Sequence, residues 1–160
     1  MTKVRAAASL DEVAELWKSL ARHHYAVGPS ISRVGEPIGP ERSWLARRRQ
    51  YATWSREPDW LLLVAERDGE VAGYAAARIT PSASAWDFGD RVGRLETLTV
   101  APTARSCGLG TALVNEVRRH WRGAGVRAAT VTVIAGNDDA LRFYERLGTV
   151  QFSRTAVFPV

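Results

Sequence analysis

The chain has 160 residues, of which 46% are hydrophobic and 24% charged, and its formal net charge is +5. These proportions are ordinary for a soluble globular protein, and the length suits one domain over residues 1–160. No apolar run approaches the roughly 20 residues that span a bilayer, and the acidic pair Asp11-Glu12 argues against a signal peptide. The lone Cys107 permits no internal disulfide and no cysteine-based metal site. We therefore expect a cytoplasmic protein with no membrane contact and no metal.

The first third of the chain predicts an edge strand and two helices. Residues 3–7 form a short candidate strand, and Ser9 then stands as a helix N-cap with Glu12 three residues later, the pattern of a capping box. A loop rich in Gly, Pro and Ser follows at residues 28–39. A second helix is predicted over residues 40–54, because proline suits its first turn.

A β-hairpin is predicted next. Residues 60–66 are apolar enough for a buried strand, and Asp68-Gly69 is the strongest hairpin turn signal in the chain. The partner strand covers residues 71–79, with a bulge expected at Gly73. Residues 81–93 then read as a polar loop before the next strand.

The central unit of the chain is a strand, a loop that contains glycines, and a helix. β-Branched residues are frequent in residues 95–100, and Ala101-Pro102 ends that strand. The helix that follows has one apolar face, formed by Gly110, Leu113, Val114, Val117 and Trp121. The first turn of such a helix leaves backbone N–H groups without partners, so the loop before it is suited to bind an anion such as a diphosphate.

The last part of the chain predicts a strand, a helix and further strands. Residues 128–134 are almost purely β-forming, and Gly123 and Gly125 separate them from the preceding helix. Asn137 or Asp138 caps the last helix, which Gly148 ends, and residues 149–160 are expected to supply one or two final strands.

Two motifs in these segments resemble one known family. Arg105-Ser106-Cys107-Gly108-Leu109-Gly110 has neither the ending of a P-loop nor the glycine spacing of a dinucleotide fingerprint. It looks like the Arg-x-x-Gly-x-Gly pyrophosphate loop of the GNAT-type N-acetyltransferases. The segment from Asn137 to Gly148 resembles that family's Asn-x-x-Ala-x-x-Phe-Tyr-x-x-x-Gly pattern. The resemblance covers roughly residues 60–150, although Thr149-Val150 stands where the family usually has an aromatic residue.

The resemblance implies a fold and a reaction. It implies an α/β (α+β) GNAT acyltransferase fold, with a mixed, mostly antiparallel sheet of six to seven strands, about four helices and splayed central strands. It also implies acetyl transfer from acetyl-CoA to a primary amine in a ternary complex. Coenzyme A is a polyanion, so the excess of arginine needs no nucleic acid to explain it, and no base-stacking or groove-reading motif points to one.

The chemistry of such a transfer assigns candidate roles. An alkylammonium with a pKa of about 10.4 must lose a proton before attack, and a departing thiolate gains from receiving one. Tyr144 stands where the family's tyrosine protonates the sulfur, although a tyrosine beside Phe143 is commonly a core residue. Glu96 is the candidate base, directly or through water; alternatively it is a surface carboxylate paired with Arg94 or Arg78. The N–H of Leu98 is the expected oxyanion donor.

The resemblance also assigns the cofactor-binding residues. Leu98, Thr99 and Val100 would pair with the pantetheine amides as a strand would, and Asn137 would hydrogen-bond the pantetheine arm, cap the last helix, or do both. The diphosphate would lie on the loop and the first helical turn. The full cofactor-binding set is Leu98, Thr99, Val100, Arg105, Ser106, Cys107, Gly108, Leu109, Gly110, Thr111, Asn137 and Tyr144.

The acceptor site is expected within residues 20–55 and 80–92. These segments hold the aromatic residues Trp44, Tyr51, Trp54, Trp86 and Phe88 with the acidic residues Glu36, Glu41, Asp87 and Asp90. That combination suits a cationic amine, whether a small molecule or a peptide. His24 either packs in the core or at its rim, or it lines this acceptor site. A homodimer is compatible with the family, and a catalytically silent acyl-CoA-binding or regulatory module is the alternative function.

Overall fold

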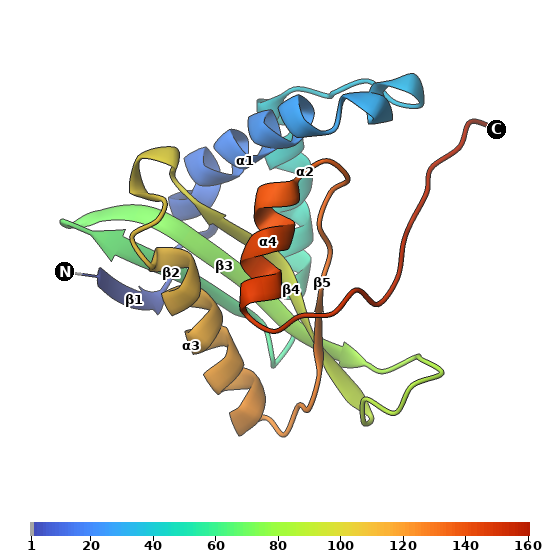
Figure 1. Ribbon diagram of the computed structural model, residues 1–160. Helices are drawn as coiled ribbons and strands as arrows, with labels where there is room; N and C mark the ends of the chain where they lie inside the picture. Colours follow the sequence, from blue (N-terminus) through green and yellow to red (C-terminus); the bar gives the residue numbers. More distant parts are fainter. Residues whose placement is uncertain (1) are drawn as a thin grey trace.

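The computed structural model describes residues 2–160 (Figure 1). Its described residues form a five-stranded sheet in the order β1-β2-β3-β4-β5. The first four strands are antiparallel neighbours, and β5 lies parallel to β4. The strands are β1 (Thr2–Ala6), β2 (Leu61–Arg67), β3 (Glu70–Pro81), β4 (Arg91–Val100) and β5 (Ala129–Val131).

Helices cover both faces of the sheet (Figure 1). The α-helices are α1 (Ala14–Val27), α2 (Pro40–Trp54), α3 (Leu109–Gly123) and α4 (Asp138–Arg146), with short 3₁₀ segments η1 (Leu10–Val13), η2 (Pro29–Arg33) and η3 (Pro102–Ala104). Successive residues of a strand point to opposite faces, so β2 and β3 contribute alternate side chains to two cores. Leu63 and Ala75 pack toward α3 and α4, whereas Val64 and Tyr74 pack toward α1 and α2.

The predicted β2–β3 hairpin is confirmed. Arg67 pairs with Glu70 across a two-residue turn, in which Asp68 and Gly69 have φ angles of 54° and 86°. Two positive φ angles define the type I′ turn that matches the twist of the flanking strands. The extra residue of the predicted bulge is Ala72, since Ala65 pairs with Gly73 and Glu66 with Val71.

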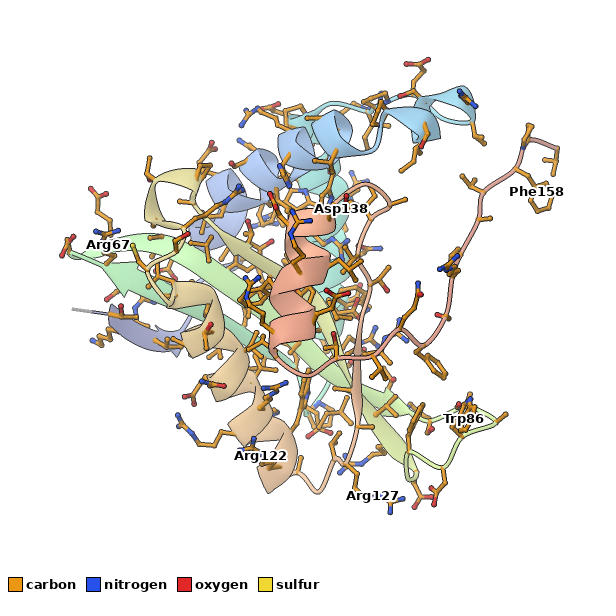
Figure 2. All side chains as sticks on the ribbon, viewed as in Figure 1. Arg67, Trp86, Arg122, Arg127, Asp138 and Phe158 are labelled. Carbon is orange, nitrogen blue, oxygen red and sulfur yellow. The ribbon has the colours of Figure 1, made fainter. Side chains whose placement is uncertain are left out.

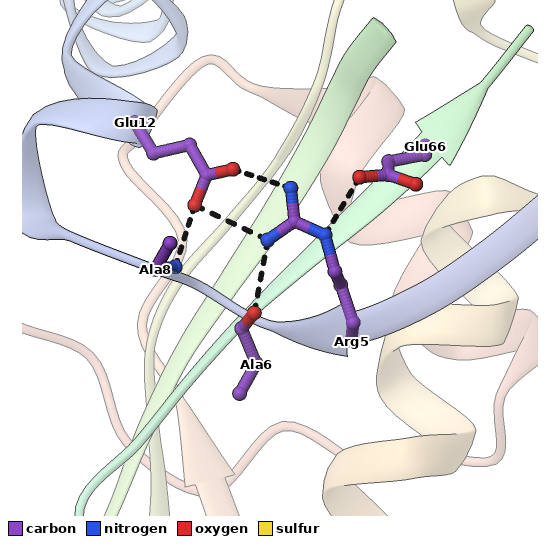
Figure 3. A network of polar contacts seen from close by, with 5 residues as sticks. All are labelled: Arg5, Ala6, Ala8, Glu12 and Glu66. Carbon is purple, nitrogen blue, oxygen red and sulfur yellow. Dashed lines mark hydrogen bonds and ion pairs between the residues drawn. The ribbon is translucent and has the colours of Figure 1, made fainter. Parts of the chain in front are cut away.

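The first helical segment begins in a different way from the predicted capping box. Ser9 is the N-cap of η1, but its side chain makes no capping hydrogen bond. Instead, Glu12 accepts a hydrogen bond of 2.7 Å from the N–H of Ala8 and forms an ion pair with Arg5 of β1 (Figure 3). Arg5 also contacts Glu66 of β2 at 2.6 Å. This network joins the edge strand to its neighbour and to the start of η1.

The strands β4 and β5 pair over only three positions. Gly93, Arg94 and Leu95 lie opposite Ala129, Thr130 and Val131, and beyond Leu95 the described part of β5 offers β4 no partner. On its other edge, β4 stays paired with β3 as far as Val100. One edge of β4 is therefore open from Glu96 onward, as expected for splayed central strands.

The C-terminal part of the sheet differs from the prediction. Five strands form among the described residues, rather than six or seven, and β5 spans Ala129–Val131 rather than residues 128–134. Residues 149–160 contain no strand, and they extend away from the sheet (Figure 1). Their large apolar side chains are exposed, including Val150 and Phe158.

Among the described residues, no helix is long and apolar enough to cross a membrane.

Gly93 provides a test of how tightly α3 packs on β4. A Cβ atom at this position would lie 2.6 Å from Cε2 of Trp121, which is closer than real contacts allow. We expect Gly93→Ala to lower the free energy of unfolding by about 1–3 kcal/mol in urea denaturation. Gly123→Ala is the control, because no atom lies within 4 Å of its added Cβ. Equal effects of the two substitutions would contradict the packing described.

Candidate active site

The loop before α3 presents a row of backbone donors. Ser106 and Gly108 have positive φ angles of 61° and 79°, and Gly108 is the N-cap of α3. Among the described residues, the N–H groups from Ser106 to Thr111 have no intramolecular acceptor; the first bond of the helix is from Ala112 to the carbonyl of Gly108. Unpartnered N–H groups at a helix N-terminus make an anion site. The loop therefore has the donors that a diphosphate requires.

Packing on α4 holds this helix start in place. A Cβ at Gly110 would lie 3.3 Å from the ring of Phe143, so the absence of a side chain lets α3 and α4 approach closely. Leu109 is only 1% exposed and anchors the first turn in the core. The donors of the loop are thus fixed by buried contacts on the other side of the helix.

Two arginines border the loop. Arg105 donates weakly from Nε to the carbonyl of Val100, at 3.5 Å. Arg67 lies at the end of β2, and its Nη1 is 3.0 Å from Sγ of the exposed Cys107. Arg67 was not predicted as a residue of this site, since it is separated from Cys107 by 40 positions and only the turn at residues 68–69 indicated where β2 ends.

The open edge of β4 is set by a bulge at Glu96. Leu95 pairs with Ala77 and Thr97 with Ala76, so Glu96 is an extra residue on β4. Gly93 donates its N–H to Ala128 on the β5 side, whereas Ala101 donates to Ala72 on the β3 side. A regular strand would point both N–H groups the same way, and the extra residue reverses the alternation. The N–H groups of Leu98 and Val100 consequently face the open edge.

Glu96 lies on the face of the sheet that α1 and α2 cover. Its side chain is 17% exposed, and Oε1 lies 3.6 Å from Nη1 of Arg78. Arg78 also donates two hydrogen bonds to Glu57, at 3.0 and 2.7 Å, and its guanidinium covers the ring of Trp54 at 4.6 Å. The ion pair with Arg78 is thus the one that the alternative interpretation of Glu96 anticipated.

Tyr144 is a buried residue of α4. It is 8% exposed, and its ring packs at 5.2 Å against that of Phe143 in an edge-on arrangement. Burial raises the pKa of Tyr144 above its usual value, because a phenolate would lose its hydration there. A phenol is neutral at pH 7, and burial keeps it so, which leaves Tyr144 with a proton that it can donate.

Asn137 serves as the predicted cap of α4. Its side-chain oxygen accepts a hydrogen bond of 3.3 Å from the N–H of Ala140, and His23 Nε2 of α1 lies 3.4 Å from the same oxygen. The side chain is 9% exposed. Asn137 therefore joins α1 to α4 at the end of the sheet where β4 and β5 part.

The aromatic residues expected around the acceptor do not form one site. Trp44 and Tyr51 are buried in the core, where Tyr51 Oη is 2.6 Å from Oγ1 of Thr97 on β4. Trp86 is 68% exposed on the β3–β4 loop, far from α1 and α2 (Figure 2), and Phe88 packs against Phe152. The aromatic residues of segments 20–55 and 80–92 therefore lie in separate regions, because packing places them apart.

A pocket of about 270 Å³ does lie on the α1–α2 side. It is formed by the C-terminal half of α1, the α1–α2 connection and Ile134 after β5. Its walls include Trp17, His24 and Glu36. Burial, chiefly, and the charges of His23 and Arg47 lower the pKa of His24. The structure thus places His24 at the wall of this pocket.

Comparison with known proteins identifies the family. Residues 14–149 match the acetyltransferase (GNAT) family. This match covers most of the chain and includes both motifs as well as the two helices that precede them. The chain belongs to the GNAT acetyltransferase family.

Curated relatives in this family are longer than the chain. A mycothiol acetyltransferase from Cellulomonas flavigena is 34% identical over 113 residues, which make up 69% of this chain and 31% of that protein. A mycothiol acetyltransferase from Thermomonospora curvata is 36% identical over 111 residues, with 69% and 33% covered. The chain therefore spans about a third of the length of these relatives.

Solved structures share the GNAT fold. A GCN5-related N-acetyltransferase from Ralstonia eutropha superposes with a TM-score of 0.76 at 15% identity, and the match covers 100% of this chain and 97% of that one. An aminoglycoside N-acetyltransferase in complex with CoA gives a TM-score of 0.71 at 19% identity, and the match covers 100% of this chain and 95% of that one.

Among the described residues of this chain, no three His, Cys, Asp or Glu side chains are grouped to hold a metal ion.

The burial of Tyr144 predicts how stability depends on pH. Below the usual tyrosine pKa of 10.0, folded and unfolded chains both keep the proton. Above it, the unfolded chain loses the proton first, so the free energy of unfolding falls as the pH rises. We expect Tyr144→Phe to make this fall shallower in urea denaturation between about pH 9.5 and 11. An unchanged slope would show that the phenol ionises in the folded state.

Proposed function

We propose that the chain transfers an acetyl group from acetyl-CoA to a primary amine in a ternary complex. One observation carries the proposal: the unpartnered N–H groups of Ser106 to Thr111 lie next to the open edge of β4. This combination offers a diphosphate site continuous with a strand edge that can pair with amides. Family membership and the names of the relatives support acetyl transfer, and the relatives extend well beyond the part that this chain matches.

The chain's own groups would hold the cofactor in two ways. The amides from Ser106 to Thr111 would bind the diphosphate, with Arg105 beside them, and the open edge of β4 from Leu98 to Val100 would pair with the pantetheine amides. Asn137 is the proposed contact to the same arm. Bound there, acetyl-CoA supplies the acyl group in an activated thioester.

Three groups would then serve the transfer. The amine nitrogen bonds to the acyl carbon while the C–S bond breaks, the sulfur leaves with the electron pair, and the amine gives up a proton. The N–H of Leu98 is the proposed donor to the acyl oxygen, where negative charge develops. Tyr144 is the proposed donor of a proton to the sulfur, since its burial keeps the phenol neutral. Glu96 is the proposed acceptor of the amine's proton, directly or through water. To accept the proton, the carboxylate of Glu96 must give up its contact with Arg78.

Calorimetry with CoA and thioester consumption over a panel of amines test the proposal as a whole. Binding of CoA together with amine-dependent consumption supports an enzyme. Binding without consumption for any amine overturns the proposal in favour of a catalytically silent acyl-CoA-binding module. The absence of binding overturns both.

The role of the backbone donors can be tested at Thr111. Thr111 is exposed in the first turn of α3, so Thr111→Pro removes one N–H group while Thr111→Ala keeps it. Loss of one charge-assisted hydrogen bond should raise the Kd for CoA about tenfold in calorimetry. Thr111→Ala should bind as the wild type does, and melting curves should show both variants folded. Equal affinities of the two variants would remove this N–H from the site.

The role of Tyr144 predicts a separation of binding from turnover. Tyr144→Phe keeps the ring that packs on Phe143 and removes only the hydroxyl. We expect kcat to fall about 100-fold or more in a thioester assay, as is typical for loss of a general acid, with the Kd for CoA little changed. A variant that retains full kcat would exclude Tyr144 from the proton transfer.

A further inference from the structure

Arg47 of α2 differs from the arginines around it. Its guanidinium is half-buried and lies 4.4 Å from the ring of Trp17. Arg48, the next residue, is paired with Asp11, and Arg78 is paired with Glu57 and Glu96. Within residues 2–160, Arg47 has ring contacts but neither a hydrogen bond nor a carboxylate within ion-pair distance. Its five N–H donors are therefore left for solvent or a ligand.

Aromatic side chains hold this guanidinium in a fixed place. Trp17 is 8% exposed, and its Nε1 donates to Oγ of Ser43 at 3.1 Å, which fixes the ring under Arg47. The rings of Tyr51 and Trp54 lie 5.7 and 5.8 Å from the same guanidinium. A stacked guanidinium keeps its donors in its own plane, at the edge of the ring, where they match the two oxygens of a planar oxyanion.

This fixed cation is on the side of the sheet where Glu96 lies. Trp54 is contacted by both Arg47 and Arg78, and Arg78 in turn contacts Glu96. Trp17, on which Arg47 rests, is also a wall of the 270 Å³ pocket. A continuous series of contacts therefore links the pocket wall to Arg47 and, through Trp54 and Arg78, to Glu96.

Two of the four carboxylates expected to attract a cationic acceptor are paired with cations. Asp87 is paired with Arg127 on the far loop, and Glu41 lies 3.7 Å from Lys18. Glu57 and Glu96 share Arg78, whose single positive charge offsets one of their two negative charges. Arg47 thus combines a charge that no carboxylate pairs with and a position held against aromatic rings, whereas Glu36 of the pocket wall is exposed and is likewise without an ion pair among the described residues.

We propose that the acceptor of this acetyltransferase is a primary amine that also carries an oxyanion, a carboxylate or a phosphate, and that Arg47 binds this anionic group. The inference rests on the proposed function and narrows its substrate class. It restricts the expected cationic amine to amines that also carry an anionic group. In this arrangement the amine of the substrate faces Glu96. The anionic group binds the N–H donors at the edge of the planar Arg47 guanidinium.

Matched pairs of amines test this specificity. Phenylalanine and phenethylamine differ by one carboxylate, and glucosamine 6-phosphate and glucosamine differ by one phosphate, so the two pairs distinguish the two anions. We expect kcat/KM to be at least about tenfold higher for the anionic member of one pair, a difference typical of a charge-assisted hydrogen bond. Equal values within both pairs, or a preference for the uncharged members, overturn the inference.

Substitution of Arg47 links the preference to this residue. In Arg47→Gln the ratio of kcat/KM values within the preferred pair should fall to about one, whereas Arg47→Lys, which keeps the charge but not the planar fork, should retain part of it. Arg48→Gln is the matched control, because it removes an equal charge from the neighbouring position and should leave the ratio unchanged. If Arg48→Gln lowers the ratio as much as Arg47→Gln does, general surface charge explains the preference and the inference fails.

A binding experiment covers the case in which the protein consumes thioester with other amines but with no member of these two pairs. Calorimetry of N-acetylphenylalanine against N-acetylphenethylamine, both with CoA present, compares the same two chemistries without catalysis. Tighter binding of the carboxylate, lost in Arg47→Gln but kept in Arg48→Gln, supports the inference. Equal binding or no binding of either probe overturns it. Failure of CoA itself to bind would instead reject the proposed function from which the inference starts.

Discussion

The site depends on one extra residue in β4. From Gly93 to Leu95 the strand is paired on both edges, so its backbone groups there are satisfied. The bulge at Glu96 reverses the direction of the following N–H groups and coincides with the end of pairing to β5. Unpaired strand edges are ordinarily avoided because they invite association. Here the open edge lies within the sheet rather than at its rim, where α4 and the loop after β5 restrict which partner can reach it.

Packing on both faces of the sheet holds this opening in place. On one face, Gly110 lets α3 approach Phe143 of α4, which positions the helix start and its donors. On the other, a Cβ at Gly136 would lie 2.0 Å from the carbonyl oxygen of Val27, so the loop between β5 and α4 is pressed against the end of α1. The two cores thereby fix β5 at a distance from the second half of β4, although only three residue pairs join these strands.

Local features of the fold were predictable because short-range rules determine them. The turn at Asp68-Gly69, the apolar face of α3 and the cap at Asn137 each depend on residues within one or two turns of one another. The C-terminal strands could not be predicted in this way, because a strand forms only where a neighbour offers hydrogen bonds. One or two strands were expected in residues 149–160, yet no described strand pairs with them. The absence of the aromatic residue that the family has after this glycine was the one sequence signal of a difference.

The acceptor side could not be predicted from composition, because tertiary pairing decides which charges remain free. The sequence shows aromatic and acidic residues in residues 20–55 and 80–92, and their co-occurrence suggested a cationic ligand. In the folded chain Glu41 and Asp87 already face a lysine and an arginine, and two of the aromatics form core instead of wall. The position of a free charge is therefore a property of the whole fold. Arg47 and Arg48 are adjacent and chemically identical, but α2 turns one toward Trp17 and the other toward Asp11, and only the first is left to bind a ligand.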